Sequence, residues 1–411
     1  MHTSEYIELD ETYGAHNYKP LNIVINRGQG VWVTDVEGKR YLDCLSAYSA
    51  VNQGHCHPRI VDAIIQQAQA LTLTSRAFRN DQMGLFLKEL CELTGYEMAL
   101  LMNTGAEAVE TAVKAARKWG YEKRGIPVDA AEIIVCSDNF HGRTVTIISF
   151  STEAQYRTNF GPFTPGFKVV PFGDVAALQA AFTPNTVAFL VEPIQGESGV
   201  HIPPPGYLSW AKALCEEHDA LFIADEIQSG LGRSGALFAS YAEGVKPDMM
   251  IVGKALSGGF YPVSAVLASR DVLSVFRPGD HGSTYGGNPL GCAVARAALR
   301  VLVDEGLIEN SAQLGTYFQE RLRAIPSPYI KEVRGRGLFI GVELHAAAGG
   351  ARRFCEALAQ RGLLCKETHQ HVIRFAPPLI ITRQEIDWAL ERIEPVLLGQ
   401  FEGAPVMAAI A

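Results

Sequence analysis

The chain has 411 residues, of which 47% are hydrophobic and 19% charged, so it can bury the cores of two or three globular domains. A formal net charge of −8 and a pI near 5.8 argue against nucleic acid or an anionic membrane as the main partner. Eight cysteines are scattered without CxxC spacing, and the amino terminus has neither an apolar signal segment nor an Arg-rich transit sequence. We therefore expect free thiols, a reducing compartment and a cytoplasmic location.

The first 50 residues alternate turn signals with short strand-like runs, which are too few to form a core alone. We predict a hairpin of residues 28–35 and 39–43. Two helices follow, one from Pro58 and one from Gln82 to about Leu93.

Between residues 100 and 270, apolar runs of strand length alternate with helical patterns. The predicted strands lie near 132–137, 145–150, 168–171, 187–192, 221–225, 249–252 and 263–267. The predicted helices lie near 105–118, 175–182 and 207–218. This alternation predicts an α/β domain with a mainly parallel, seven-stranded sheet that is flanked by helices on both faces.

After Gly291 the pattern changes to that of a smaller α+β domain. The predicted order is helices at 291–305 and 309–324, strands around 330–344, a helix at 351–361, strands at 363–366 and 372–376, and a helix at 383–398. We therefore expect an arm at 1–50 that packs with the small domain, a large domain at 51–290, the small domain at 291–400 and a tail at 401–411.

Two apolar runs in residues 221–259 each lead into a charged residue. The run LFIA precedes Asp225, and MMIVG precedes Lys254. If both runs are strands of one sheet, the acid and the amine lie at its carboxyl edge, where open α/β sheets bind ligands. Burial lowers the pKa of a lysine, and a neutral amine is a nucleophile. A lone lysine more often extends to solvent, so the neighbouring residues decide between the two interpretations.

Those neighbours, IADEIQSGLGRSG at 223–235 and GKALSGGFYPVSAV at 253–266, resemble the signature of the class III aminotransferases. The resemblance implies pyridoxal 5'-phosphate (PLP) as cofactor on the fold called type I. Lys254 would be the covalently joined, catalytic lysine, Asp225 would pair with the protonated pyridine nitrogen, and Gln228 would lie beside the ring oxygen. An anion suits this place because the ring absorbs negative charge only while its nitrogen stays protonated.

The spacing Thr104-x-x-Glu107 is a capping box, which predicts the start of a helix whose free N–H groups can bind phosphate. The resemblance places the PLP phosphate here, at Gly105 and Ala106. It also implies phosphate contacts from Ser283 and Thr284, with Thr284 reaching across the interface of a homodimer that shares its active sites and could assemble further.

Four residues are candidates for the ring and the substrate. In the motif FHGRT at 140–144, the resemblance implies that Phe140 stacks on the pyridine ring, and Arg143 offers a fork suited to a carboxylate. Arg374 lies in an apolar run, and the resemblance pairs it with Glu197. While the pair holds, a diamino acid would present its terminal amine; when Glu197 turns away, Arg374 could bind the α-carboxylate of 2-oxoglutarate. A fixed structural ion pair is the alternative.

The segments GAHNY at 14–18 and SAYSAVNQGHCHP at 46–58 resemble the ornithine aminotransferases, a likeness that extends over residues 12–400. It implies that Tyr18 contacts the α-amino and carboxylate end of ornithine and that Tyr48 lies along the pocket. The implied reaction transfers the δ-amino group of L-ornithine to 2-oxoglutarate, giving glutamate 5-semialdehyde, which cyclises to pyrroline-5-carboxylate, and glutamate.

Several alternatives remain open at this point. His141 stands where animal ornithine enzymes have tryptophan and where acetylornithine aminotransferases often have histidine. The rivals are acetylornithine and 4-aminobutyrate aminotransferases, then a PLP mutase on the same fold and a binding protein without activity. We expect no metal site, because His55-Cys56-His57 has no second ligand cluster at a workable spacing.

Overall fold

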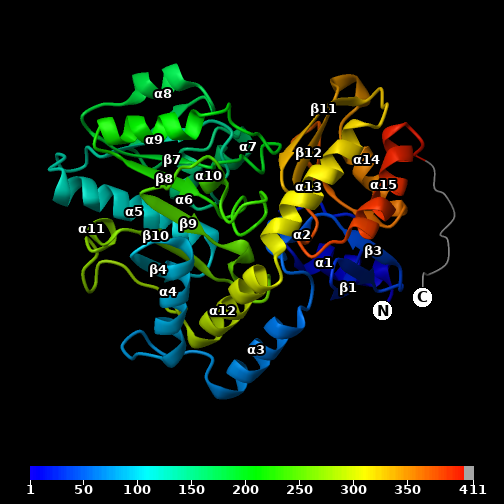
Figure 1. Ribbon diagram of the computed structural model, residues 1–411, viewed down its shortest axis with the longest axis horizontal. Helices are drawn as coiled ribbons and strands as arrows, with labels where there is room; N and C mark the ends of the chain where they lie inside the picture. The colour runs from blue at the N-terminus through cyan, green and yellow to red at the C-terminus, as the bar shows by residue number, and fades with distance from the viewer. Residues whose placement is uncertain (402–411) are drawn as a thin grey trace.

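The computed structural model describes residues 1–401, so the tail predicted at 401–411 lies outside this range from residue 402 onward. Figure 1 shows a larger body around one sheet and a smaller body to its right, with α12 (Pro289–Asp304) below the first and α13 (Leu307–Arg323) alongside the second. Within residues 1–401, no helix is both long enough and apolar enough to cross a membrane.

The larger body is built on a seven-stranded sheet with the order β4-β10-β9-β8-β7-β5-β6. The strands from β9 to β6 in this order are parallel, whereas β10 runs antiparallel to both of its neighbours. The bounds are β4 Met98–Met102, β5 Glu132–Cys136, β6 Phe167–Val170, β7 Thr186–Val191, β8 Leu221–Asp225, β9 Met249–Val252 and β10 Ser264–Ala268. The predicted mainly parallel α/β architecture is confirmed.

Side chains of the central strands alternate between two covered faces. On β5, Ile133 and Val135 pack in a buried cluster with α5 (Gly105–Lys123), while Ile134 and Cys136 pack with α9 (Tyr207–Glu217) on the other face. Because both faces are covered, these strands are apolar at almost every position, as buried parallel strands are. The polar residues that end the strands are therefore the exceptions that define a site.

One predicted strand is wrong, and one observed strand was not predicted. Residues 145–150 form α6 (Val145–Ser149) instead of a strand, and Ser149 Oγ donates to the Val145 carbonyl at 2.7 Å within it. The β-branched residues there favour a strand by propensity, but packing of this turn against α5 overrides it. β4 supplies the seventh strand, since its short run leads directly into the predicted helix start at Thr104.

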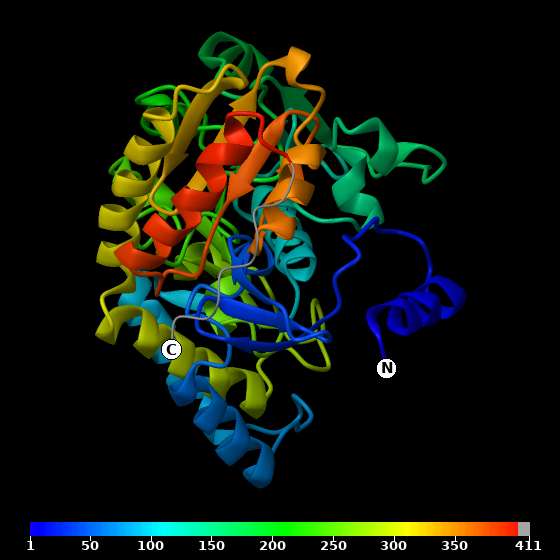
Figure 2. The ribbon, with the colours of Figure 1, turned by 90° about the vertical axis from the view of Figure 1, so that its right-hand side faces the viewer.

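The amino-terminal residues join the carboxyl-terminal part of the chain. The predicted hairpin is present as β2 (Trp32–Asp35) and β3 (Arg40–Asp43), but residues 28–29 of its predicted first strand belong to a separate strand, β1 (Ile25–Gln29). The three strands join β13 (Leu363–Leu364) in a sheet of order β1-β2-β3-β13. Helix α1 (Thr3–Tyr13) was not predicted. It buries no residue, and Figure 2 shows it away from the main body.

The smaller body holds a third sheet, of order β11-β12-β15-β14, that packs with helices as predicted for an α+β unit. Its remaining elements are β11 Ile330–Arg336, β12 Phe339–Leu344, α14 Arg352–Gln360, β14 Lys366–Thr368, β15 Val372–Phe375 and α15 Arg383–Leu397. The other helices of the chain are α2 Ser46–Ser49, α3 Pro58–Ala70, α4 Asp81–Thr94, α7 Ala154–Arg157, α8 Val175–Ala181, α10 Ala239–Ala242 and α11 Arg270–Leu273, with short 3-10 turns η1 at Lys254–Ser257 and η2 at Ala346–Ala348.

Candidate active site

The carboxyl ends of three neighbouring parallel strands surround one cavity. Glu192 follows β7, Asp225 ends β8, and Lys254 follows β9 after a single glycine. Parallel pairing places these residues at the same edge of the sheet. The cavity has a volume of about 200 Å³ and is lined by Gly105, Ala106, Phe140, His141, Gly142, Glu192, Ile194, Asp225, Ile227, Gln228 and Lys254.

Lys254 is held in a strained conformation at the wall of this cavity. It begins η1 with a φ of +46°, which is uncommon for a residue other than glycine and costs about 1–3 kcal/mol. Burial lowers the pKa of the Lys254 amine, although the negative charge of Glu197 opposes this. The surrounding structure therefore favours a neutral amine at the cavity.

Asp225 is fixed by a histidine at the floor of the cavity. His141 Nδ1 lies 2.6 Å from Asp225 Oδ2, and both side chains are buried. Burial opposes a charged imidazole, but the hydrogen bond and charge of Asp225 outweigh it and raise the pKa of His141. The other ring nitrogen, Nε2, is buried without a hydrogen-bond partner within residues 1–401.

Two further buried carboxylates lie close by: Glu226 has a structural role, and Glu192 faces the cavity. Glu226 accepts hydrogen bonds from Ser229, Ser240 and the Ala239 backbone, so it anchors α10 and does not face the cavity. Glu192 lines the cavity and accepts from the Phe140 backbone N–H at 2.9 Å. Glu192 was not among the predicted site residues, although a charge at the end of an apolar strand, the signal that identified Asp225, also marks it.

The start of α5 forms the other end of the cavity. Thr104 and Glu107 form the predicted capping box, and Glu107 also accepts from the backbone N–H of Asn103. The first N–H groups of a helix have no partner within it, and the first two residues of α5, Gly105 and Ala106, line the cavity. Their position suits a phosphate or another anion.

Ser283 and Thr284 differ in where the structure places them. Asn103 Nδ2 donates to Ser283 Oγ at 3.0 Å, which brings Ser283 beside the start of α5. Thr284 is exposed and lies on the surface next to it. Within one chain, only Ser283 is thus joined to the anion-binding end.

Arg374 and Glu197 meet as the sequence predicts. Arg374 Nη1 lies 2.8 Å from Glu197 Oε1, and the arginine is 1% exposed. Burial would raise the pKa of Glu197, but the charge of Arg374 lowers it to about 2. Gln228 Nε2 donates to the same Glu197 oxygen at 3.0 Å, while Gln228 Oε1 is buried without a partner within residues 1–401. Arg374 also lies over the Tyr48 ring, 5.2 Å from its centroid.

Arg143 and Tyr18 lie nearer the surface. The Arg143 guanidinium lies 5.5 Å from the centroid of the Phe140 ring and 3.4 Å from that of Tyr156, a residue that was not predicted to belong to the site. Tyr18 is 76% exposed on the amino-terminal arm, close enough to Tyr48 to raise the pKa of that phenol slightly, after burial and Glu197.

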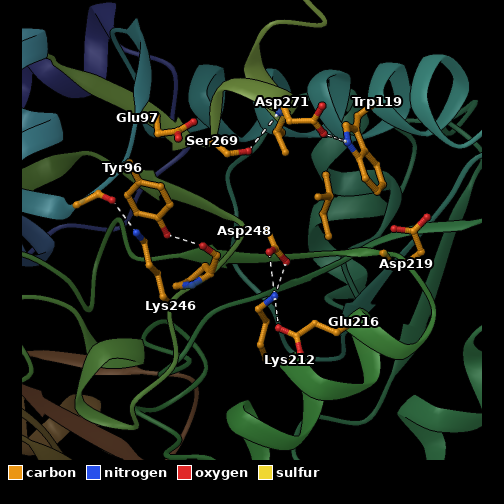
Figure 3. A pocket seen from close by; sticks show the side chains of 15 residues that line it. Tyr96, Glu97, Trp119, Lys212, Glu216, Asp219, Lys246, Asp248, Ser269 and Asp271 are labelled. Atoms are coloured by element: carbon orange, nitrogen blue, oxygen red, sulfur yellow. Dashed lines mark hydrogen bonds and ion pairs between the residues drawn. The ribbon is translucent and has the colours of Figure 1, made fainter.

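A second, larger cleft of about 640 Å³ lies at the opposite edge of the sheet, where β8 and β9 begin. Several of its charged groups have partners within the cleft: Lys212 pairs with Asp248 and Glu216, and Asp271 accepts a hydrogen bond from Trp119 (Figure 3). Lys246 donates to the Gly95 carbonyl at 2.6 Å. None of the predicted site residues lines this cleft.

Comparison with known proteins agrees with the geometry. Residues 13–397 match the family described as aminotransferase class-III. The chain is 61% identical over 396 residues to the ornithine aminotransferase of Bordetella pertussis, covering 96% of each chain. It is 63% identical over 395 residues to that of an Exiguobacterium species, covering 96% of this chain and 98% of the relative.

Solved structures with the same fold include both of the substrate types that the sequence left open. The ornithine aminotransferase of Toxoplasma gondii superposes with a TM-score of 0.95 at 47% identity, over 97% of this chain and 95% of that one. An acetylornithine aminotransferase from Elizabethkingia anophelis superposes with a TM-score of 0.88 at 48% identity, over 97% of this chain and 99% of that one.

Proposed function

The chain belongs to the class III aminotransferases, and from this premise we propose that it transfers the δ-amino group of L-ornithine to 2-oxoglutarate. The products are glutamate 5-semialdehyde, which cyclises to pyrroline-5-carboxylate, and glutamate. The observation that carries the choice of the δ-amine is the buried ion pair of Arg374 and Glu197, which denies the arginine to an α-carboxylate. Similarity to ornithine aminotransferases over nearly the whole chain supports the same choice.

The cofactor of this family is PLP, and the residues at the cavity fit it. When bound, PLP supplies an aldehyde that joins covalently to amines and a ring that absorbs negative charge. Gly105 and Ala106 would bind its phosphate, and Asp225 would hold the proton of the ring nitrogen. The unpartnered Gln228 Oε1 is available to a polar group of the cofactor or of a water beside it.

Lys254 would act as the base of the reaction. Its pKa is lowered by burial, and a lowered pKa favours the neutral amine that a base needs. We propose that it moves the proton of the substrate carbon that bears the amine. His141 would keep Asp225 in place, because their 2.6 Å contact fixes the carboxylate at the floor of the cavity.

The two substrates would use the arginines in turn. While Glu197 neutralises Arg374, ornithine would place its δ-amine in the cavity beside Lys254, with Tyr18 at its α-amino and carboxylate end and Tyr48 along the pocket. When Glu197 turns away, Arg374 can bind the α-carboxylate of 2-oxoglutarate. Arg143, which is exposed and lies over the Tyr156 ring, would bind a second substrate carboxylate.

We also propose a homodimer with shared active sites, in which Thr284 reaches the partner's phosphate site. The exposed Thr284 supports this, as do two exposed large apolar side chains, Phe78 at 70% and Tyr285 at 49%. The division into an arm, a large domain and a small domain, with boundaries near 50 and 290, is proposed with it; the pairing of β3 with β13 supports an arm that packs with the small domain. The cytoplasmic location stays a prediction from the sequence.

The test is a single half-reaction. Purified protein loaded with PLP is mixed with ornithine, acetylornithine or 4-aminobutyrate without any oxo acid, and the cofactor absorbance is followed. We expect rapid conversion to the amino form with ornithine and slow or no conversion with the other two. Faster conversion with acetylornithine than with ornithine would overturn the proposal.

A further inference from the structure

Arg143 lies against aromatic rings and pairs with no acid. Its guanidinium is 3.4 Å from the centroid of Tyr156 and 5.5 Å from that of Phe140. It makes no ion pair with any of the residues that the structure describes. By contrast, Arg374 donates to Glu197 at 2.8 Å. Two arginines thus lie near the cavity, and among residues 1–401 an acid neutralises Arg374 but not Arg143.

Tyr156 is itself held firmly enough to orient this arginine. It lies on α7, whose first turn is capped by the Glu153 side chain, which accepts from Gln155 N at 3.3 Å. The next residue, Arg157, donates to the Ser151 carbonyl at 2.9 Å and stacks on a neighbouring phenylalanine. The Tyr156 ring also meets Phe140 edge to face, with 6.2 Å between centroids and 80° between planes.

A guanidinium on the face of a ring keeps its N–H donors free at its edge. Such a cation–π contact contributes about 0.5–2 kcal/mol and fixes the plane of the fork, which a bidentate bond to a carboxylate requires. Without the ring, a long arginine side chain would lose rotamer freedom on binding and bind more weakly. The Tyr156 ring contacts Phe140, which lines the cavity, so the Arg143 side chain that lies on Tyr156 is beside the cavity.

We propose that Tyr156 is a specificity-determining positioning residue, which holds the Arg143 fork for the carboxylate of the dicarboxylic oxo acid that is distal to its carbonyl group. This rests on the proposed function, in which Arg374 takes the α-carboxylate of the same substrate. A substrate with two carboxylates is best held by two cations; Arg374 would supply one, and Arg143, which makes no ion pair within residues 1–401, would supply the other. Tyr156 thereby extends the site to α7, which contains none of the residues that the sequence predicted for the site.

The experiment compares Tyr156→Leu with Tyr156→Phe, which restores the ring but not the hydroxyl. Each variant is assayed with 2-oxoglutarate and with 2-oxobutanoate, an oxo acid that lacks the distal carboxylate. Tyr156→Leu should raise the KM for 2-oxoglutarate by about 3- to 30-fold, the range of a cation–π contact, with kcat little changed. Tyr156→Phe should stay within about twofold of the natural protein, and neither variant should change kcat/KM for 2-oxobutanoate.

Three results would overturn the proposal: an unchanged KM for 2-oxoglutarate in Tyr156→Leu, an equal loss with both oxo acids, or equal damage from Leu and Phe. Single-turnover conversion by ornithine serves as a separate readout. If the natural protein fails it, the proposed function fails; if it succeeds and Tyr156→Leu shows no selective loss, only the present inference fails. Tyr156→Gln, which has a similar reach and no ring, replaces the leucine variant if that one does not fold, with the same expected result.

Discussion

The two edges of the seven-stranded sheet differ in how they treat their charged groups. At the carboxyl edge, a cavity of about 200 Å³ brings together Asp225, Glu192 and Lys254, and two polar atoms there, Gln228 Oε1 and His141 Nε2, are buried without partners within residues 1–401. At the amino edge, a cleft of about 640 Å³ is lined by more charged residues, but these are held in ion pairs and hydrogen bonds within the chain (Figure 3).

The comparison shows that unsatisfied polar groups, and not volume, indicate a ligand. A buried polar atom without a partner costs about 1–3 kcal/mol, and a ligand can remove that cost. The direction of the chain also favours ligand binding at the carboxyl edge, because α5 begins there and its free N–H groups face that edge. The larger cleft offers a ligand only charges that are already paired.

The largest effect should come from replacing the lysine of the carboxyl edge. Lys254→Ala should lower kcat with ornithine and 2-oxoglutarate by at least about 10³-fold, because both the covalent attachment and the base are lost. Borohydride reduction of the PLP-loaded natural protein, followed by peptide mapping, should label Lys254 and no other lysine. Turnover without label at Lys254 would contradict its assignment as the catalytic lysine, and the carboxyl edge would no longer be identified as the reactive one.

The next effect concerns Glu192 and pH. Burial raises the pKa of Glu192 from 4.5 to about 7, with the charge of His141 opposing it. Between these pH values the folded protein binds the proton and the unfolded chain does not, so stability falls as pH rises through this window. Glu192→Gln imitates the protonated form and can still accept from Phe140, so it should be more stable than the natural protein by about 1–3 kcal/mol at pH 8 and equally stable at pH 4.

Chemical denaturation at the two pH values checks this expectation. The matched control is Glu216→Gln, which removes the exposed carboxylate of a surface ion pair at the amino edge and should change stability by less than about 1 kcal/mol at either pH value. A Glu192→Gln variant that shows no pH dependence relative to the natural protein would mean that Glu192 titrates normally despite its burial.

A third prediction tests whether the ion pair at the carboxyl edge acts as a switch. Glu197→Ala should lower the preference for the δ-amine of ornithine over the α-amine of glutamate by about tenfold, because Arg374 becomes free to bind α-carboxylates in both half-reactions. The ratio of kcat/KM for the two amines measures it. The control is Glu343→Ala, which breaks a different arginine–glutamate pair, with Arg334, in the smaller body. Glu343→Ala should lower stability without changing the preference between the two amines. If Glu197→Ala also leaves that preference unchanged, the pair of Glu197 and Arg374 is structural and does not act as a switch.

The sequence predicted the parts of the site that follow from single strands. Lys254 and Asp225 could be found because each follows an apolar run, and their place at one sheet edge follows from parallel pairing. The same reasoning could have found Glu192. The contact of His141 with Asp225 joins residues 84 positions apart, and that of Arg143 with Tyr156 depends on the turn of α7, so neither follows from local patterns.

The errors in the fold have a similar origin. The β-branched run at 145–150 predicted a strand, but its packing against α5 makes it α6, and local propensity cannot anticipate such a contact. The count of seven strands was nevertheless correct, because β4 takes the missing place. Helix α1 buries nothing within the chain and has a weak apolar periodicity, so it left no pattern to recognise.

The smallest effect should come from the amino edge. Lys212 pairs with Asp248 at 2.9 Å and with Glu216 at 2.9 Å, and although burial opposes it, these contacts raise the pKa of the Lys212 amine. The raised pKa means that the contribution of these ion pairs to stability is present at pH 7 and is lost only above the ordinary lysine range.

Lys212→Met keeps the aliphatic stem and removes the charge, so it should lower the free energy of unfolding by about 1 kcal/mol or less. Thermal unfolding should show this as a small drop in Tm, while kcat/KM for ornithine and 2-oxoglutarate should stay within about twofold. A selective loss with one of the two substrates would show that the amino edge takes part in the reaction, and the contrast between the two edges would no longer hold.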